Sequence, residues 1–109
     1  MFEYIAKVIK VYDGDTITCN IDLGFGIKFA KQKIRLAGIN APELRGSTKV
    51  EGIISRDALA DLILNKEIIL KTLQDKKGKY GRFLGIVFIN DLNVNQWMID
   101  NNYAVKYMD

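Results

Sequence analysis

Hydrophobic and polar residues alternate near the start of the chain, and the alternation predicts two β-strands. In ITCNID, residues 17–22, the apolar residues Ile17, Cys19 and Ile21 share one face and the polar residues between them share the other. The sequence DGDT, residues 13–16, supplies a turn between the two strands. These residues are therefore expected to pair, with the cysteine in the core.

The pattern changes from strand to helix after the third strand. Gly24 and Gly26 suggest a bend before that strand, which is expected over residues 31–37. A helix is then predicted from Ser47 or Thr48, either of which can cap it, to about residue 65. Its apolar positions recur at helical spacing and are Val50, Ile53, Ile54, Ala58, Leu62 and Ile63. Its expected polar face is Glu51, Ser55, Asp57 and Asp61.

Two further strands and a short helix complete the expected elements. The strands cover residues 67–73 and 82–89, and the helix covers residues 94–101 and buries Trp97 and Met98. Five strands with one long helix between the third and fourth is the order of an OB-fold barrel, which commonly binds nucleic acids. We therefore predict an α+β, mainly β, single domain over residues 1–109.

Composition indicates a globular protein and bears on where in or outside the cell it is expected. Hydrophobic residues make up 49% and charged residues 27% of the 109 residues, as in globular rather than disordered proteins. No apolar run approaches the roughly 18 residues that span a bilayer, so no membrane partner is expected. One cysteine gives no disulfide framework, and no secretory signal is visible at the start of this chain. A monomer inside a cell is the expectation.

The absence of histidine excludes several kinds of chemistry. Without it there is no Ser-His-Asp or Cys-His nucleophile and no histidine acid, base or zinc ligand. Any hydrolysis must rest on carboxylates, lysine or arginine, and a metal. The net charge of +3 favours an anionic partner, and DKKGKYGR, residues 75–82, is the most basic stretch.

Three segments carry candidate chemistry, each with a plainer interpretation beside it. In VYDGDT, residues 11–16, two carboxylates flank one glycine and could bind a hard cation such as calcium, although Asp-Gly is also an ordinary hairpin turn. A phosphatase aspartate pair would need a parallel sheet with alternating helices, and an EF-hand would need further spaced acidic residues; the chain offers neither. The basic stretch could be a solvated loop.

The segment RLAGINAPE, residues 35–43, contains the only proline of the chain. Pro42 fixes its own φ and restricts the residue before it, so Glu43 leaves a stiffened backbone. Arg35 lies between two apolar residues of a strand and is expected to face away from the core. Its plainer interpretation is a solvated strand cation, with Glu43 as the start of a polar loop.

These three segments together resemble the staphylococcal nuclease family. DGDT, the R-L-x-G-x-x-x-P-E run and K-Y-G-R occur in the family's order with compatible spacing, and the resemblance covers about residues 5–107. It implies a calcium-dependent phosphodiesterase that cleaves DNA or RNA and leaves 3′-phosphate and 5′-hydroxyl ends. Single strands would be the easier substrates to reach.

The resemblance also implies a role for each matching residue. Arg35 and Arg82 would contact the scissile phosphate, and Glu43 would act as general base or position the attacking water. Asp15 would bind calcium, with Asp13 as a supporting acid. The remaining expected site residues are Asn40 and the Ala41 carbonyl as metal ligands, and Lys79, Tyr80 and Tyr107 as substrate ligands.

Asn40 departs from the family pattern, which has a second metal-binding aspartate at this position. An amide oxygen can bind calcium but removes one negative charge, and ligand charge is one of the terms that set calcium affinity. Weaker metal binding than in relatives with aspartate is therefore expected. The same departure is the main argument for an alternative, an OB-fold module that binds nucleic acid or peptide without cutting. Retention of Asp15, Arg35, Glu43 and Arg82 favours the enzyme, and a purely structural barrel would leave the clustered lysines unexplained.

Overall fold

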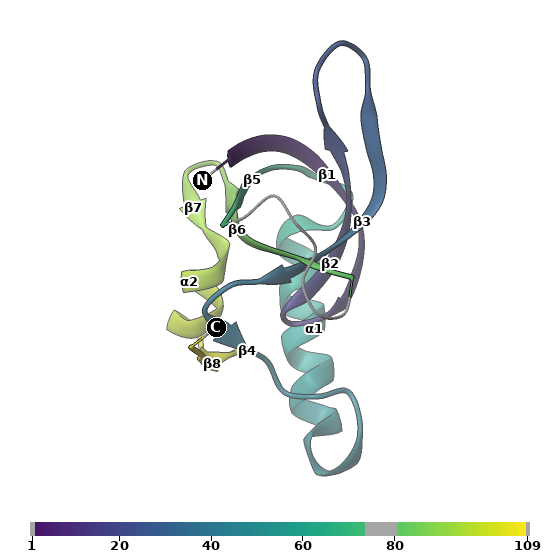
Figure 1. Cartoon of the computed structure of the whole chain (residues 1–109). Coiled ribbons are helices and arrows are strands. Elements are labelled where there is room, and N and C mark those ends of the chain that lie inside the picture. Colours follow the sequence, from purple (N-terminus) through teal and green to yellow (C-terminus); the bar gives the residue numbers. More distant parts are fainter. Residues whose placement is uncertain (1, 74–80, 109) are drawn as a thin grey trace.

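Five long strands form a sheet that closes on itself in the computed structural model, which describes residues 2–73 and 81–108. They are β1 (Phe2–Asp13), β2 (Thr16–Asp22), β3 (Lys28–Leu36), β5 (Glu67–Thr72) and β6 (Phe83–Ile89). The strands follow the order β3-β2-β1-β5-β6, and a parallel pairing of β3 with β6 closes the barrel (Figure 1). The closing pair joins only Ile34–Leu36 of β3 to the start of β6. The predicted OB-fold is confirmed.

Helices and very short strands connect and cover the barrel. In chain order they are β4 (Ile39–Asn40), the 3₁₀ turn η1 (Gly46–Thr48), α1 (Lys49–Ile63), β7 (Leu92–Asn93), α2 (Val94–Asp100) and β8 (Val105–Lys106). The helix α1 lies between the third and fourth long strands, as predicted. The pairing of β4 with β8 was not predicted, because two-residue strands have no visible alternation. None of the helices in the described ranges is both long and apolar enough to cross a membrane.

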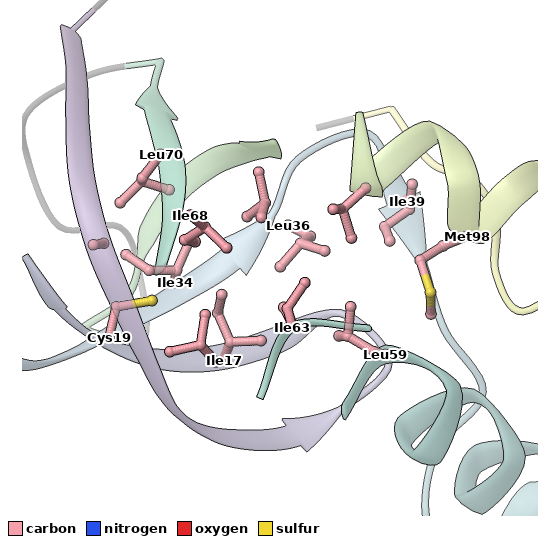
Figure 2. Packing of buried hydrophobic residues seen from close by; sticks show 14 of the residues in the cluster. Ile17, Cys19, Ile34, Leu36, Ile39, Leu59, Ile63, Ile68, Leu70 and Met98 are labelled. Atoms are coloured by element: carbon pink, nitrogen blue, oxygen red, sulfur yellow. The ribbon is translucent and has the colours of Figure 1, made fainter. Parts of the chain in front are cut away.

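The barrel interior is filled by the inward residues of every long strand, together with Leu59 and Ile63 of α1 and Met98 of α2 (Figure 2). The inward faces of β2 and β3 follow the predicted alternation, and Ile17 and Cys19 are fully buried. Burial raises the pKa of the Cys19 thiol to about 12, so this side chain serves packing rather than chemistry. Trp97 is only partly buried, against the outside of the core.

The predicted apolar face of α1 is correct at Ile63 and at the partly buried Leu62 but wrong at Val50 and Ile54, and Ser55, expected on the polar face, is buried. The buried side of this helix consists of Gly52, Ser55, Leu59 and Ile63, whereas Val50 is 67% and Ile54 is 53% exposed. Gly52 and Ser55 face other backbone segments rather than the barrel core, and close approach of backbones requires small residues. An added Cβ at Gly52 would overlap the Glu43 carbonyl. Apolar periodicity cannot detect an interface of this kind.

The hairpin between β2 and β3 extends beyond the rest of the barrel at the top of Figure 1. Gly24 and Gly26 both have positive φ, at 80° and 74°, and form the predicted bend. The third strand begins at Lys28, earlier than expected, and so the two strands continue together toward this bend.

Candidate active site

The turn between β1 and β2 carries two aspartates and packs against α1 through the glycine between them. The Asp15 N–H donates to Asp13 Oδ1 at 3.0 Å, which fixes the turn. Gly14 packs so closely that an added Cβ would lie 2.7 Å from the Ala41 Cβ and overlap the Ser55 hydroxyl. The Ser55 hydroxyl in turn donates to the Tyr103 carbonyl at 2.8 Å. The turn is therefore held in place by packing as well as by its own sequence.

Asp15 and Arg35 form a buried ion pair beside this turn. Asp15 Oδ2 lies 3.5 Å from Arg35 Nη2, and the two side chains are 9% and 15% exposed. The same oxygen accepts the Ala41 N–H at 2.8 Å. Charges with so little access to water stay charged only when they are paired and hydrogen-bonded, and here both conditions hold.

The guanidinium of Arg35 is fixed on several sides. Its Nη1 donates to the Leu36 carbonyl at 2.8 Å, and its Nη2 donates to Asn40 Oδ1 at 3.4 Å. Its Cζ lies 5.8 Å from the centroid of the Tyr107 ring. Arg35 thus connects the two expected metal ligands, Asp15 and Asn40, with the tyrosine expected to line the nucleotide site. Tyr107 itself is half exposed.

Thr16 connects this group to Arg82. Its hydroxyl donates to Asp15 Oδ1 at 3.0 Å and accepts from Arg82 Nη1 at 3.5 Å. The parallel register that pairs Ile34 with Phe83 brings the start of β6 beside the end of β3, and with it the two arginines. The sequence analysis quoted Thr16 within DGDT but gave it no role.

A cleft of about 720 Å³ opens beside this group of contacts. It is lined by Lys10, Tyr12, Asp13, Thr16, Thr18, Lys33, Glu43, Arg45 and Arg82. Four of these side chains are cationic and two are acidic, so the cleft suits an anionic ligand. Glu43 and Arg82 line it directly, and the Asp15–Arg35 pair adjoins it through Thr16.

Glu43 lies at the mouth of the cleft on a segment that packs against α1. Its side chain is 70% exposed and lies 3.6 Å from Arg45 Nε, an exposed ion pair that holds it only weakly. Its backbone is better fixed. The Glu43 carbonyl accepts a hydrogen bond from the Thr48 hydroxyl at 2.9 Å, and the same carbonyl packs directly against Gly52 of α1. The carboxylate can therefore change its direction while its backbone stays in place.

The surroundings of Asp13 disfavour its negative charge. The pKa of Asp13 is raised from 3.8 to about 6, first by burial and then by the hydrogen bond to Asp15 and its negative charge. A cation bound here would relieve that repulsion. Asp15 and Asn40 also both direct oxygens at one atom, Arg35 Nη2, so oxygen ligands converge beside the turn. This donor set fits a hard cation.

The number of acidic ligands is nevertheless small. Within residues 2–73 and 81–108, no group of three or more Asp, Glu or Cys side chains is placed to hold a metal ion. A cation would rely on two carboxylates, the Asn40 amide and water. The described contact of Ala41 with Asp15 uses its N–H, so metal binding by its carbonyl stays a prediction.

Two predicted substrate ligands cannot be assigned a position. Lys79 and Tyr80 lie outside the described residues. The structure brings together the other eight expected residues, through direct contacts or through the shared cleft: Asp13, Asp15, Arg35, Asn40, Ala41, Glu43, Arg82 and Tyr107.

Several cleft residues were missed by the sequence analysis. Lys10, Thr18 and Lys33 lie side by side on three neighbouring strands, since Thr18 pairs with Lys10 on one side and Lys33 on the other. The outward positions of the alternating strands were visible in the sequence, but the register between strands was not.

Known proteins resemble this chain over most of its length. The family described as staphylococcal nuclease homologue matches residues 33–109. An uncharacterized endonuclease of Haemophilus influenzae is 36% identical over 93% of this chain and 51% of its own length. A thermonuclease of Staphylococcus hyicus is 29% identical over 94% of this chain and 59% of its own length.

A third relative, a probable staphylococcal-like nuclease of Oryza sativa subsp. japonica, is 35% identical over 68% of this chain and 18% of its own length. The chain spans little more than half the length of the first two relatives and less than a fifth of the third. Both the barrel topology and the matched residues agree with the resemblance found in the sequence. The chain belongs to the staphylococcal nuclease homologue family.

Proposed function

We propose that this chain hydrolyses phosphodiester bonds of DNA or RNA in the cleft beside the β1–β2 turn. One observation carries the proposal: Glu43 and Arg82 line the same cationic cleft, and contacts through Thr16 and Asp15 join Arg82 to Arg35. A carboxylate and two guanidinium groups are thereby gathered from three separate parts of the chain. The names of the relatives, which include an endonuclease and a thermonuclease, support the same activity.

The two arginines would stabilise the charge that develops on the phosphate. Guanidinium groups bind phosphate oxygens through two parallel N–H donors, which lysine cannot do. Arg35 is held by Asp15 and by the Leu36 carbonyl, so it needs little reorganisation when substrate binds. Glu43, at the mouth of the cleft and free to turn, would orient or deprotonate the attacking water.

We further propose that activity depends on calcium. Asp15, Asn40 and the Ala41 carbonyl would hold the ion, with Asp13 as a supporting acid. A bound divalent cation would supply positive charge that stabilises the phosphate oxygens. The small number of acidic ligands predicts weak binding. The 3′-phosphate and 5′-hydroxyl products, and the roles of Lys79, Tyr80 and Tyr107 in holding the substrate, are part of the same proposal.

A binding module without catalysis is the second candidate. It is favoured by Asn40 and by the absence, among the described residues, of a group of three acidic ligands. Such a module would bind the same anionic ligand in the same cleft, so binding alone cannot distinguish the two candidates.

Hydrolysis by purified protein distinguishes them. We expect cleavage of single-stranded DNA or RNA in calcium and none in chelator. Glu43→Gln and Arg82→Ala should each reduce the rate by about 10²- to 10³-fold, the usual loss for one such group. Because Arg35→Ala would leave Asp15 buried without its partner, Arg35→Lys is the better variant, and it should lose rate while staying folded.

Lys71→Gln is a matched control, because it removes one charge on the far side of the barrel, where Lys71 pairs with Glu3 at 3.8 Å. Thermal melts of every variant establish that it is folded. Cleavage that persists in chelator would contradict calcium dependence. No cleavage in millimolar calcium, with binding retained, would favour the binding module.

A further inference from the structure

A face of the barrel next to the cleft carries five lysines. We call it the lysine face; it consists of Lys7 and Lys10 on β1 and Lys28, Lys31 and Lys33 on β3. Lys7 and Lys33 project outward because their strand neighbours, such as Val8 and Ile34, fill the barrel interior, and Lys10 and Lys28 are also exposed. Lys31 is exposed at a bulge in β3, where it opposes Asn20 of β2.

Strand register brings these lysines together across three strands. Lys10 and Lys33 both neighbour Thr18, and Lys7 pairs with Asn20. The Lys31 backbone N–H donates to Asn20 Oδ1 at 2.9 Å, and Lys28 pairs with Asp22 at 3.1 Å. The lysines therefore follow β2 on both of its sides, from the cleft toward the tip of the hairpin.

Two acidic residues border this face: Glu67, which lies opposite Lys7 in the register of β1 with β5, and Asp22. Asp22 is engaged with Lys28, and in the described part of the chain no ion pair joins Lys7, Lys10, Lys31 or Lys33 to a carboxylate. A row of unneutralised cations on a sheet attracts an extended anion, and each phosphate that it contacts releases counterions.

The lysine face is continuous with the cleft. Lys10, Thr18 and Lys33 belong both to the face and to the lining of the cleft. An extended ligand bound in the cleft would therefore continue along β2 toward the tip of the hairpin, past Asp22, whose charge is paired with Lys28.

The hairpin tip ends this path with an exposed aromatic ring. Phe25 is fully exposed, the most exposed large hydrophobic side chain in the described residues. Its turn is ordered, because the Gly24 N–H donates to Asp22 Oδ1 at 2.8 Å and the Leu23 N–H donates to the Ile27 carbonyl at 2.9 Å. A fully exposed ring on a hydrogen-bonded turn is a suitable platform for stacking a nucleobase.

We propose that the lysine face and Phe25 form a binding track for single-stranded nucleic acid that enters or leaves the cleft. The lysines would contact successive phosphates, and Phe25 would stack on a base at the far end of the track. The assignment of nucleic acid as the ligand rests on the proposed function. An anionic membrane is less well matched, since the polar side chains of Thr18, Asn20 and Asp22 run along the middle of the face.

Binding of oligonucleotides of increasing length tests this track. Oligothymidylates of about 2 to 16 nucleotides, a range that covers the site sizes of OB-folds, are titrated by fluorescence anisotropy. The protein carries Glu43→Gln and is kept in chelator, so that nothing is cleaved. Affinity should rise with length and then level off once the strand reaches from the cleft to the tip.

Two exposed positions provide variants that do not threaten folding. Lys31→Gln should weaken binding of the long oligonucleotide and reduce the steepness of log K against log salt by about 0.7, the value for one phosphate contact on a single strand. Phe25→Ala should weaken binding of the long oligonucleotide about fivefold or more and leave the shortest one unaffected. Lys71→Gln, which removes the same charge from the far side of the barrel, should change neither the affinity for the long oligonucleotide nor its salt dependence.

The outcomes separate the track from the proposed function. Length-dependent binding with no hydrolysis by the unmodified protein would overturn the nuclease and leave the track in place. Hydrolysis combined with length-independent affinity, or with normal long-strand binding in Lys31→Gln and Phe25→Ala, would overturn the track. Binding to vesicles of anionic phospholipid that is lost in Phe25→Ala, with no oligonucleotide binding, would overturn it in favour of a membrane surface.

Discussion

A few side chains at the β1–β2 turn set the chemistry of the site. Asp15 has both carboxylate oxygens engaged, one by Thr16 and one by Arg35 and the Ala41 N–H. Asn40 adds an oxygen to the same group without adding charge. These side chains are well fixed by hydrogen bonds but carry little negative charge, and both the affinity for calcium and the dependence of stability on pH should therefore respond to a change of one charge.

Replacing Asn40 by aspartate should strengthen calcium binding. The added charge would join the oxygens of Asp15 beside Arg35, and affinity for calcium depends in part on ligand charge. Isothermal titration calorimetry of wild type and Asn40→Asp with calcium measures the change, and the calcium concentration that gives half-maximal cleavage should fall with it. An unchanged or higher calcium requirement would show that position 40 is not a metal ligand.

Asp13 should make stability depend on pH in metal-free solution. Its pKa is higher in the folded state, about 6, than the ordinary 3.8, so the fold favours the protonated form. The resulting stabilisation is fully present below about pH 4 and is lost as the pH rises through 6. Asp13→Asn keeps an oxygen to accept the Asp15 N–H but carries no charge.

The variant should therefore have a higher Tm than wild type above pH 6, with a difference that shrinks toward pH 4. Melts by circular dichroism in chelator across this pH range measure it. A difference in Tm that is constant with pH would contradict the raised pKa. Added calcium should reduce the difference if the ion binds beside this turn.

At the scale of elements, α1 acts as the support for the site rather than as a conventional amphipathic helix. Its first turns present Gly52 to the Pro42–Glu43 backbone and Ser55 to Gly14 and Tyr103. Larger side chains on this side would separate the helix from the two segments that carry Asp15 and Glu43. Apolar residues on its other sides, such as Val50, are left exposed as a result.

Gly52→Ala should damage activity more than stability. Alanine favours a helix by about 1 kcal/mol over glycine, so local preference alone would stabilise the variant. Its Cβ, however, would lie 3.0 Å from the Pro42 carbonyl and overlap that of Glu43, which must move. A shift of about 1 Å can cost on the order of 10²-fold in rate.

Rates of oligonucleotide cleavage and thermal melts measure the two effects in the same preparation. Ile54→Ala is the matched control, because this residue is 53% exposed on the same helix and should change neither quantity greatly. Full activity in Gly52→Ala would mean that the position of Glu43 does not depend on this contact.

At the scale of the whole molecule, a single buried amide ties α2 to the closed barrel. Asn95 accepts the Val87 N–H at 3.1 Å and donates to the Ala37 and Gly85 carbonyls at 2.9 and 3.1 Å. It therefore connects α2, the strand β6 and the chain that leaves β3 toward the site. Its backbone partners are otherwise shielded from water, and leaving such groups unpaired is costly.

Asn95→Ala should reduce the free energy of unfolding by on the order of 3 kcal/mol, from three buried hydrogen bonds at about 1 kcal/mol each. Urea denaturation measures the loss. Gln96→Ala serves as the control, since Gln96 is exposed on the same helix and bonds Asp100 at the surface. If Asn95→Ala lowered the free energy of unfolding no more than Gln96→Ala, water would be replacing the hydrogen bonds of the Asn95 amide.

The sequence by itself determined most of the elements and named the candidate site residues. Turn chemistry at DGDT and alternation in residues 17–22 are properties of neighbouring residues, and the structure has both. Candidates such as Arg35 and Glu43 were also identified, because their residue types and spacing within the chain matched a known motif. The spacing of apolar residues did not predict the buried side of α1, because Gly52 and Ser55 are buried by backbone segments that are distant in the sequence.

Tertiary structure alone decided how these residues act together. The contacts of Asp15 with Arg35 and Ala41, and the connection through Thr16 to Arg82, join positions up to 66 residues apart. The lysine face likewise depends on the register of three strands. Alternation fixes which side of a strand a residue occupies, but only pairing and barrel closure fix its neighbours, because those contacts form between segments that carry no local information about one another.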